Sequence, residues 1–184
     1  YYTGRGDAIT IGSWRGSRSC HNRVVRCLID GTADDGIAIE ATEGGFCNSN
    51  LVYGNIVKNN AEVGIEINTD AGSIARSNIF SNNTIKGHRD FYSFFLQSWS
   101  GGKTENNIIC SNTISSGGFD GILIWSRDQG SSSAGNLVVI NRIKSHANNG
   151  ISIEYDSGGS APNNAIIGNK CQENRGVGLL FLAS

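Results

Sequence analysis

A single pattern of apolar and polar positions repeats along almost the whole chain. It runs from an asparagine through an apolar pair, a second asparagine and another apolar pair to a closing Gly-Ile-x-Ile segment. The first asparagine recurs at a nearly constant interval, at Asn22, Asn50, Asn78, Asn107, Asn136 and Asn164, so successive differences are 28, 28, 29, 29 and 28. The start of the closing segment recurs at Gly36, Gly64, Ser93, Gly121, Gly150 and Gly178, with differences of 28, 29, 28, 29 and 28. Two markers that share one period indicate a solenoid.

The repeat predicts three short strands in each coil. The two isoleucines of Gly-Ile-x-Ile face one side of a strand, because strand side chains alternate. Two further columns are expected to face inward: Val24, Val52, Phe80, Ile109, Val138 and Ile166, then Ile29, Val57, Ile85, Ile114, Ile143 and Cys171. Between these two columns, Cys27 is followed by Asn55, Asn83, Asn112, Asn141 and Asn169. We expect these asparagines to take left-handed backbone angles at a bend and to join coil to coil through their amides.

The predicted fold is therefore all-β: a single-stranded right-handed parallel β-helix of about six to seven coils, in one domain over residues 1–184. In its repeat, the chain resembles the superfamily of pectin-lyase-like proteins, and the resemblance covers nearly all of it. That superfamily mostly cuts or epimerises acidic polysaccharides, but it also contains phage tailspikes and inert repeats. The resemblance implies the fold and leaves the function open.

Composition limits the classes of function. The net charge of −1 argues against a nucleic-acid-binding surface, which would be basic. No apolar run is long enough to span a membrane. Among the five cysteines, Cys27 and Cys171 are predicted to be small buried residues, while Cys20 and Cys47 lie at nearly equivalent places on adjacent coils. A disulfide between Cys20 and Cys47 is one alternative, and free thiols are the other.

The first candidate for chemistry is the segment Asp34-Asp35-Gly-Ile-Ala-Ile. It resembles the Gly-Asp-Asp-Cys-Ile-Ala-Ile segment of polygalacturonases, whose third catalytic aspartate lies one coil earlier. That register falls on Asp7. The resemblance implies that Asp7, Asp34 and Asp35 are catalytic, one protonating the leaving oxygen and another activating water. The family's Gly-His-Gly would fall on Glu62-Val63-Gly64, so its histidine is absent. The competing interpretation is that Asp34 and Asp35 form a polar bend before a strand.

The second candidate is a face built by the third to fifth coils. Its aromatic, charged and amide side chains are suited to binding a saccharide: His88, Tyr92, Gln97, Trp99, Trp125, Arg127, Asp128, Glu154 and Tyr155, with Asp156 beside them. Aromatic rings stack on sugars, and an arginine can hold a uronate carboxylate at two points. The strand end Leu96-Gln97-Ser98 resembles mannuronan C5-epimerases, although their Asp-Pro-His signature is missing. The competing interpretation is that the aromatics only cover the strand faces.

No cofactor is expected. Calcium would need clustered outward carboxylates. Glu40, Glu66 and Asp70 are the nearest such set, but Ala38 and Phe95 separate Glu66 from other acids in its column. His21, His88 and His146 lie on different coils, so no histidine metal site is predicted.

Two hypotheses follow. The first is an extracellular or cell-surface protein that processes or binds an acidic polysaccharide, as a glycoside hydrolase or a polysaccharide lyase or epimerase. The second is a non-catalytic module, a tailspike-like or adhesin segment. Neither a nucleic acid nor a membrane is an expected partner. Because no polar cap precedes Ala8-Ile9-Thr10-Ile11 or follows Leu179-Leu180-Phe181-Leu182, we expect a longer flanking β-helix or a homo-oligomer.

Overall fold

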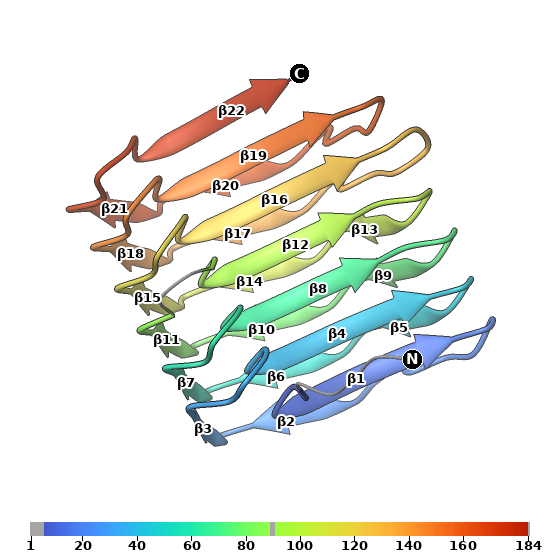
Figure 1. Cartoon of the computed structure of the whole chain (residues 1–184), viewed down its shortest axis with the longest axis horizontal. Coiled ribbons are helices and arrows are strands. Elements are labelled where there is room, and N and C mark those ends of the chain that lie inside the picture. The colour runs from blue at the N-terminus through green and yellow to red at the C-terminus, as the bar shows by residue number, and fades with distance from the viewer. Residues whose placement is uncertain (1–5, 89–90, 184) are drawn as a thin grey trace.

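The computed structural model describes residues 6–88 and 91–183, and these form the predicted right-handed parallel β-helix. Figure 1 shows its coils stacked from β1 at one end to β22 at the other. No helix occurs in the described part of the chain, and hence none that could cross a membrane. The all-β prediction and the number of coils are confirmed.

Four parallel sheets run along the stack, and we number them for reference. Sheet 1 has seven strands: β1 (Ile9–Trp14), β4 (Ile37–Thr42), β8 (Ile65–Thr69), β12 (Phe94–Ser98), β16 (Ile122–Arg127), β19 (Ile151–Asp156) and β22 (Leu179–Ala183). Sheet 2 has six: β2 (Arg23–Val25), β6 (Leu51–Tyr53), β10 (Ile79–Ser81), β14 (Ile108–Cys110), β17 (Leu137–Val139) and β20 (Ala165–Ile167). Sheet 3 also has six: β3 (Leu28–Asp30), β7 (Ile56–Lys58), β11 (Thr84–Lys86), β15 (Thr113–Ser115), β18 (Arg142–Lys144) and β21 (Lys170–Gln172).

Sheet 4 is the short one that the repeat did not predict. It contains β5 (Phe46–Asn48), β9 (Ile74–Arg76) and β13 (Lys103–Glu105), which lie between the sheet 1 and sheet 2 strands of their coils. The prediction of three strands per coil was therefore incomplete. These segments lack the β-branched pairs that mark the other strands, so periodicity alone could not reveal them.

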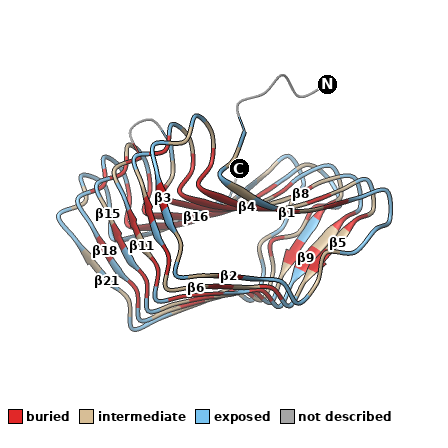
Figure 2. Ribbon diagram, turned by 90° about the horizontal axis from the view of Figure 1, so that it is seen from below, coloured by how far each residue is buried: buried red, intermediate tan, exposed pale blue. Residues whose placement is uncertain are grey.

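The interior is filled by the predicted apolar columns. Val52, Phe80, Ile109 and Val138 stand one above another in sheet 2 and are fully buried. Val57, Ile85, Ile114 and Ile143 do the same in sheet 3. Figure 2 shows these sheets enclosing the interior together with sheet 1. Burial of these columns is the main apolar contribution to stability.

Two asparagine ladders join the coils: the predicted one through Asn55 to Asn169, and a second that the sequence analysis used only as a marker of the period. Asn112 is typical: its Nδ2 donates to Asn141 Oδ1 at 3.0 Å and to the Phe80 carbonyl at 3.0 Å. Its Oδ1 accepts from the backbone N–H of Asn83 at 2.9 Å and from Asn83 Nδ2 at 3.0 Å. The second ladder, through Asn50, Asn78, Asn107 and Asn136, repeats the arrangement. Every side-chain donor and acceptor in these buried amides is thus used.

The left-handed bend residue is not the asparagine itself but the residue before it. This position is Gly54, Asn82, Ser111, Ile140 or Gly168 in successive coils, each with a positive φ. The sequence interpretation therefore placed the bend one residue too late. Ile140, with φ of 55°, is the β-branched member of this column, and it is 63% exposed.

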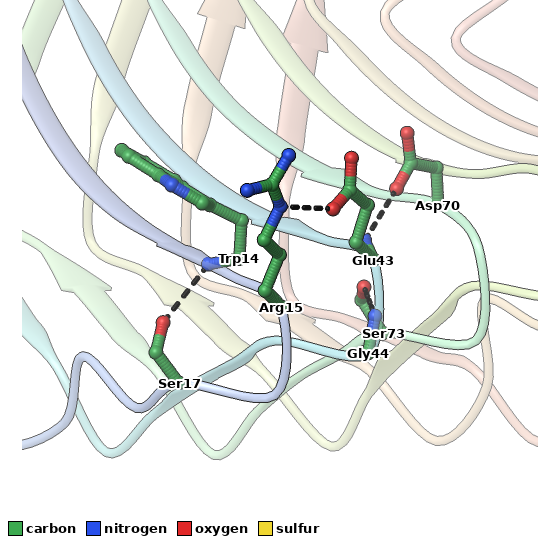
Figure 3. A network of polar contacts seen from close by, with 7 residues as sticks. All are labelled: Trp14, Arg15, Ser17, Glu43, Gly44, Asp70 and Ser73. Carbon is green, nitrogen blue, oxygen red and sulfur yellow. Dashed lines mark hydrogen bonds and ion pairs between the residues drawn. The ribbon is translucent and has the colours of Figure 1, made fainter.

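The bends between sheet 1 and sheet 4 are joined by polar contacts from coil to coil (Figure 3). Arg15 Nε donates to Glu43 Oε2 at 2.9 Å, and the Glu43 backbone N–H donates to Asp70 Oδ1 at 3.3 Å. The Gly44 backbone N–H donates to Ser73 Oγ at 3.0 Å. Both partners of the Arg15–Glu43 ion pair are exposed, so we expect this pair to contribute little to stability.

Replacing Asn112 by leucine should lower the free energy of unfolding by about 1–3 kcal/mol. The physical reason is that the buried N–H groups of Asn83 lose their acceptor. The midpoint of urea unfolding, followed by circular dichroism, measures the effect. Thr113→Val, at an exposed position of β15, is the control and should leave the midpoint almost unchanged. Equal midpoints for the two variants would contradict the ladder's role.

Ile140→Asn should stabilise the protein by about 1 kcal/mol, because a left-handed backbone costs a β-branched residue roughly 1–2 kcal/mol and asparagine tolerates it. Thermal and urea midpoints should both rise. The matched control is Ile167→Asn, another exposed isoleucine but inside β20 and outside the left-handed column. A stabilisation of the same size in the control would show that surface polarity, and not backbone strain, is responsible.

Candidate functional site

The outer face of sheet 1 carries two columns of side chains. One runs through Thr10, Ala38, Glu66, Phe95, Leu123 and Ser152, and the other through Gly12, Glu40, Asn68, Gln97, Trp125 and Glu154. In Figure 2 the bends that lead from sheet 3 into sheet 1 rise above the level of this face. The face is therefore bordered by a wall of bends, and its composition changes from acidic in the early coils to aromatic in the later ones.

A hollow of about 570 Å³ lies where these two regions meet. Its acidic lining comprises Asp7, Asp34, Asp35, Glu40, Glu62 and Glu66. Its apolar and amide lining comprises Val63, Phe91, Phe95, Asn68 and Gln97. No lysine or arginine lies among the described residues that line it. The hollow thus combines a strongly acidic wall with an aromatic one.

The structure brings Asp7, Asp34 and Asp35 together, as the register of the coils predicted. One carboxylate oxygen of each lies within 4.8 Å of those of the other two. Asp7 precedes β1 and accepts a hydrogen bond of 2.7 Å from Thr10 Oγ1. Asp34 and Asp35 precede β4, where the backbone N–H of Ala8 donates to the Asp35 carbonyl. The fold itself thus brings these three carboxylates together.

Asp35 also has a structural part. Its Oδ1 accepts a hydrogen bond of 2.8 Å from the backbone N–H of Val63, one coil on. The equivalent bond recurs from the Asn149 N–H to Asp120 Oδ1 at 2.7 Å and from the Val177 N–H to Asn149 Oδ1 at 2.9 Å. Asp35 therefore acts as a polar bend residue through its Oδ1, as the competing interpretation expected.

Glu66 extends the cluster, and the sequence analysis did not include it among the catalytic candidates. Its side chain is buried, and Gln97 Nε2 donates to its Oε1 at 2.7 Å. Burial, followed by the charge of Asp35, raises the pKa of Glu66 well above its usual range. A side-chain hydrogen bond between the two carboxyl groups raises the pKa of Glu66 further and lowers that of Asp35. It therefore favours the proton on Glu66 over Asp35.

Burial likewise raises the pKa of Asp35 to about 6 and that of Glu40 to about 7. In Glu40 the charge of Asp7 adds to the effect of burial, followed by those of Asp35 and Asp34. Like charges close together disfavour ionisation of each other. Comparing the strands of adjacent coils in the sequence could have found Glu66. It pairs with Ala38, which lies in the same coil as Asp35, so Glu66 is one coil away from Asp35.

The aromatic part of the face is a continuous cluster. The Phe95 and Trp125 rings are stacked with centroids 6.1 Å apart, and the Tyr92 ring centroid lies 4.7 Å from that of Phe95 and 5.6 Å from that of Phe119. The Arg127 guanidinium lies 5.7 Å from the Trp125 ring centroid. Phe95 and Phe119 were not among the predicted binding residues. Phe95 interrupts the acidic column and was treated only as a spacer.

Most of the predicted saccharide-binding residues lie on this face or at its edge. Gln97, Trp125 and Glu154 share one column. Trp99 donates from Nε1 to Asn68 Oδ1 at 2.9 Å, and Asp128 Oδ1 lies 3.8 Å from Arg127 Nε. The structure therefore groups these residues, while their contact with a saccharide is a proposal.

His88 and Tyr155 do not belong to this face, and their assignment to it was wrong. His88 is fully buried in the bend between sheet 3 and sheet 1, and burial lowers its pKa to about 4. Tyr155 pairs with Ser126 in the column that faces the interior, and it is exposed at the later end of the stack. His88 lies in a bend whose course the period does not fix, whereas Tyr155 follows the alternation of β19 with Ile151 and Ile153, which its assignment to the outer face overlooked.

Glu40, Glu66 and Asp70, the nearest set that the sequence offered for calcium, do not form a compact group among the described residues. Glu40 and Glu66 line the hollow, but Asp70 accepts a hydrogen bond in the bend network of Figure 3. Within residues 6–88 and 91–183, the acidic group compact enough for an ion is Asp7, Asp34 and Asp35. All five cysteines are free, so the disulfide between Cys20 and Cys47 is not formed.

Comparison with known proteins assigns the family but not an activity. The crystal structure of the periplasmic alginate epimerase AlgG matches 80% of this chain with 17% identity and a TM-score of 0.37. The match covers 50% of the epimerase chain, so this chain spans about half its length. No curated protein matches the sequence. Residues 7–175 match the family described as NosD, periplasmic copper-binding protein, and the chain therefore belongs to the NosD family.

Proposed function

We propose that this protein binds an acidic polysaccharide across the outer face of sheet 1 and acts on it by acid–base catalysis in the acidic hollow. The observation that carries the proposal is the group of carboxyl side chains in a hollow walled by Phe95, where burial raises the pKa of Asp35, Glu40 and Glu66. Carboxyl groups of opposite protonation state are what glycosidic bond chemistry requires. The family description, periplasmic, agrees with a location outside the cytoplasm.

Glu40 is the best candidate for the general acid. It lines the hollow, it is partly exposed, and its pKa of about 7 lies near a neutral working pH. Asp35, ionised above a pH of about 6, and its neighbours Asp7 and Asp34 are the candidate bases.

The spacing of the carboxylates supports this division of roles. In inverting hydrolases the acid and the base are separated by a gap that leaves room for the attacking water, from about 6.5 Å to about 9.5 Å. Oxygens of the three aspartates lie within 4.8 Å of one another, which is closer than that gap. For an inverting reaction we therefore assign the acid to a carboxyl group outside this trio, Glu40, whereas a short separation within the trio matches a retaining hydrolase.

The aromatic cluster and Arg127 supply the binding surface. The stacked Phe95 and Trp125 rings offer an apolar platform for sugar rings, and Arg127 beside Trp125 offers a cation for a carboxylate. The hollow itself carries no cation among the described residues. A polyuronate would therefore place its acidic groups towards Arg127 and a less charged portion over the hollow.

A second candidate function is binding without catalysis. The hydrogen bond from Val63 N–H to Asp35, which Asp120 and Asn149 reproduce in later coils, favours it. In that case the Asp34–Asp35 bend exists to order the entry into sheet 1, and the aromatic face alone contacts the saccharide.

Copper, which the family description names, does not fit the residues of this chain. Copper prefers nitrogen and sulfur ligands. The sequence has no methionine, and its three histidines and five cysteines all lie within the described residues. The one compact group of three potential ligands there contains only carboxylate oxygens. Cys47 is buried, and burial raises the pKa of its thiol to about 11, which disfavours the thiolate that a metal needs. We assign no step to copper.

The proposal is tested by incubating the protein with pectate, alginate and hyaluronan. Hydrolysis appears as new reducing ends, elimination as unsaturated products and epimerisation as a changed NMR spectrum. The expected result is one product class that disappears in Glu40→Gln while binding persists. Binding without product would establish the second candidate, and neither binding nor product would contradict both.

Trp125→Ala should weaken saccharide binding about tenfold, because it removes half of the stacked platform. A tenfold loss of affinity corresponds to about 1.4 kcal/mol. Quenching of tryptophan fluorescence or calorimetry measures the affinity. Tyr53→Ala is the control, since Tyr53 is a half-buried aromatic residue of β6 in sheet 2, away from the outer face of sheet 1. A loss of the same size in Tyr53→Ala would show that the effect is not specific to this face.

The raised pKa values also predict the pH dependence of stability. For Glu40 and Asp35 the folded pKa lies above the unfolded value, so folding favours the protonated forms. Their contribution is fully present below about pH 4 and is lost as the pH rises through about 6 to 7. Unfolding midpoints should therefore fall between about pH 5 and about pH 8, a window that brackets these values. Glu40→Gln should make this fall less steep, and an unchanged slope would show that Glu40 does not titrate in this range.

A further inference from the structure

A second hollow, of about 700 Å³, lies on a different side of the coil, at the bend between sheet 4 and sheet 2. Its lining includes Arg18, His21, Asn48, Arg76 and Asn106. Figure 2 places β5 and β9 at the side of the cross-section, away from the outer face of sheet 1. This hollow is therefore separate from the acidic one.

The two arginines are positioned by the coil architecture. Arg18 forms a bridge with Phe46 of β5, and its guanidinium lies 5.2 Å from the Phe46 ring centroid. Arg76 belongs to β9, where it pairs with Asn48 and its backbone N–H donates to Asn48 Oδ1 at 3.1 Å. The two arginines thus come from coils that are separated by one intervening coil, and they border the same hollow.

The charge of this hollow is opposite to that of the first. Among the described residues, its lining contains two arginines and a histidine but no carboxylate. The ion pairs in the described part of the chain involve Arg15, Lys58 and Arg127, so Arg18 and Arg76 are in none of them. Glu105 follows Arg76 in the same column, on β13, and forms no ion pair with it there. In a protein of net charge −1, this local excess of positive charge calls for an anionic ligand.

The chemistry of the lining narrows the ligand. A guanidinium fork matches the two oxygens of a carboxylate. Amide and hydroxyl groups, of the kind that hydrogen-bond to sugar hydroxyls, are added by Asn48, Ser49, Ser77 and Asn106. We propose that the hollow bounded by Arg18, His21 and Arg76 binds the carboxylate groups of an acidic saccharide, independently of the sheet 1 face.

The test is calorimetric titration of the full chain with a galacturonate trimer at low and at high salt. The wild-type protein should bind the trimer, and Arg18→Gln/Arg76→Gln should weaken binding at least tenfold. Binding should also weaken at high salt, because both arginines are exposed. Arg142→Gln is the matched control, since Arg142 is an exposed arginine of β18, outside this hollow, and takes part in none of the described ion pairs. Circular dichroism verifies that each variant is folded.

Further titrations test which kind of anion binds, and whether it binds at this hollow or at the sheet 1 face. A neutral glucose trimer should not bind at this hollow, and inorganic phosphate should bind more weakly than the galacturonate trimer. To isolate this hollow, the arginine substitutions are repeated in a Trp125→Ala background, where they should cause the same loss. Equal loss in Arg142→Gln, no loss in the double variant, or phosphate binding as tightly as the trimer would overturn the proposal.

Discussion

The structure depends on pairing the buried amides of successive coils. Each coil turns several times, and each bend would leave polar groups in the interior without a partner. The two asparagine ladders solve this, because each inner amide donates twice and accepts twice, as Asn112 does. The ladders also fix the register between coils, so that every column of sheet 1 is placed by the same constraint. The functional face is a consequence of this register.

Stacking in register has an electrostatic consequence. Residues one period apart in sequence become neighbours, so carboxylates scattered along the chain gather without any one segment being strongly acidic. Asp7, Asp35 and Glu66 come from three successive coils, and burial raises the pKa of Asp35 and of Glu66 because ionising buried acids is unfavourable. The same stacking places Arg18 and Arg76 beside one hollow at another corner. One regular scaffold thus presents two surfaces of opposite charge.

The sequence alone predicted the architecture, the inward columns, the asparagine ladder from Asn55 to Asn169 and the convergence of Asp7 with Asp34 and Asp35, because each of these follows from the period. The sequence prediction failed in the parts of the chain that the period does not describe. Sheet 4 lies in the variable segments, which lack apolar pairs, and the left-handed residue sits beside the asparagine, a shift that spacing cannot detect. His88 was assigned to the wrong side because it lies in a lengthened bend that has no alternation to follow, whereas the alternation of β19 already places Tyr155 inward and was overlooked. The raised pKa of Glu66 could not be foreseen, since it depends on burial and on distances within the hollow.

The central claim is that Glu66 stays neutral beside an ionised Asp35 in the hollow of sheet 1. Carbon-13 NMR of the side-chain carboxyl groups, titrated with pH and assigned with Glu66→Gln, tests it directly. The account predicts that the Glu66 signal keeps the chemical shift of a protonated carboxyl at neutral pH, while the pKa of Asp35 is about 6. A Glu66 signal that titrates in the ordinary range, at about 4.3, would contradict it.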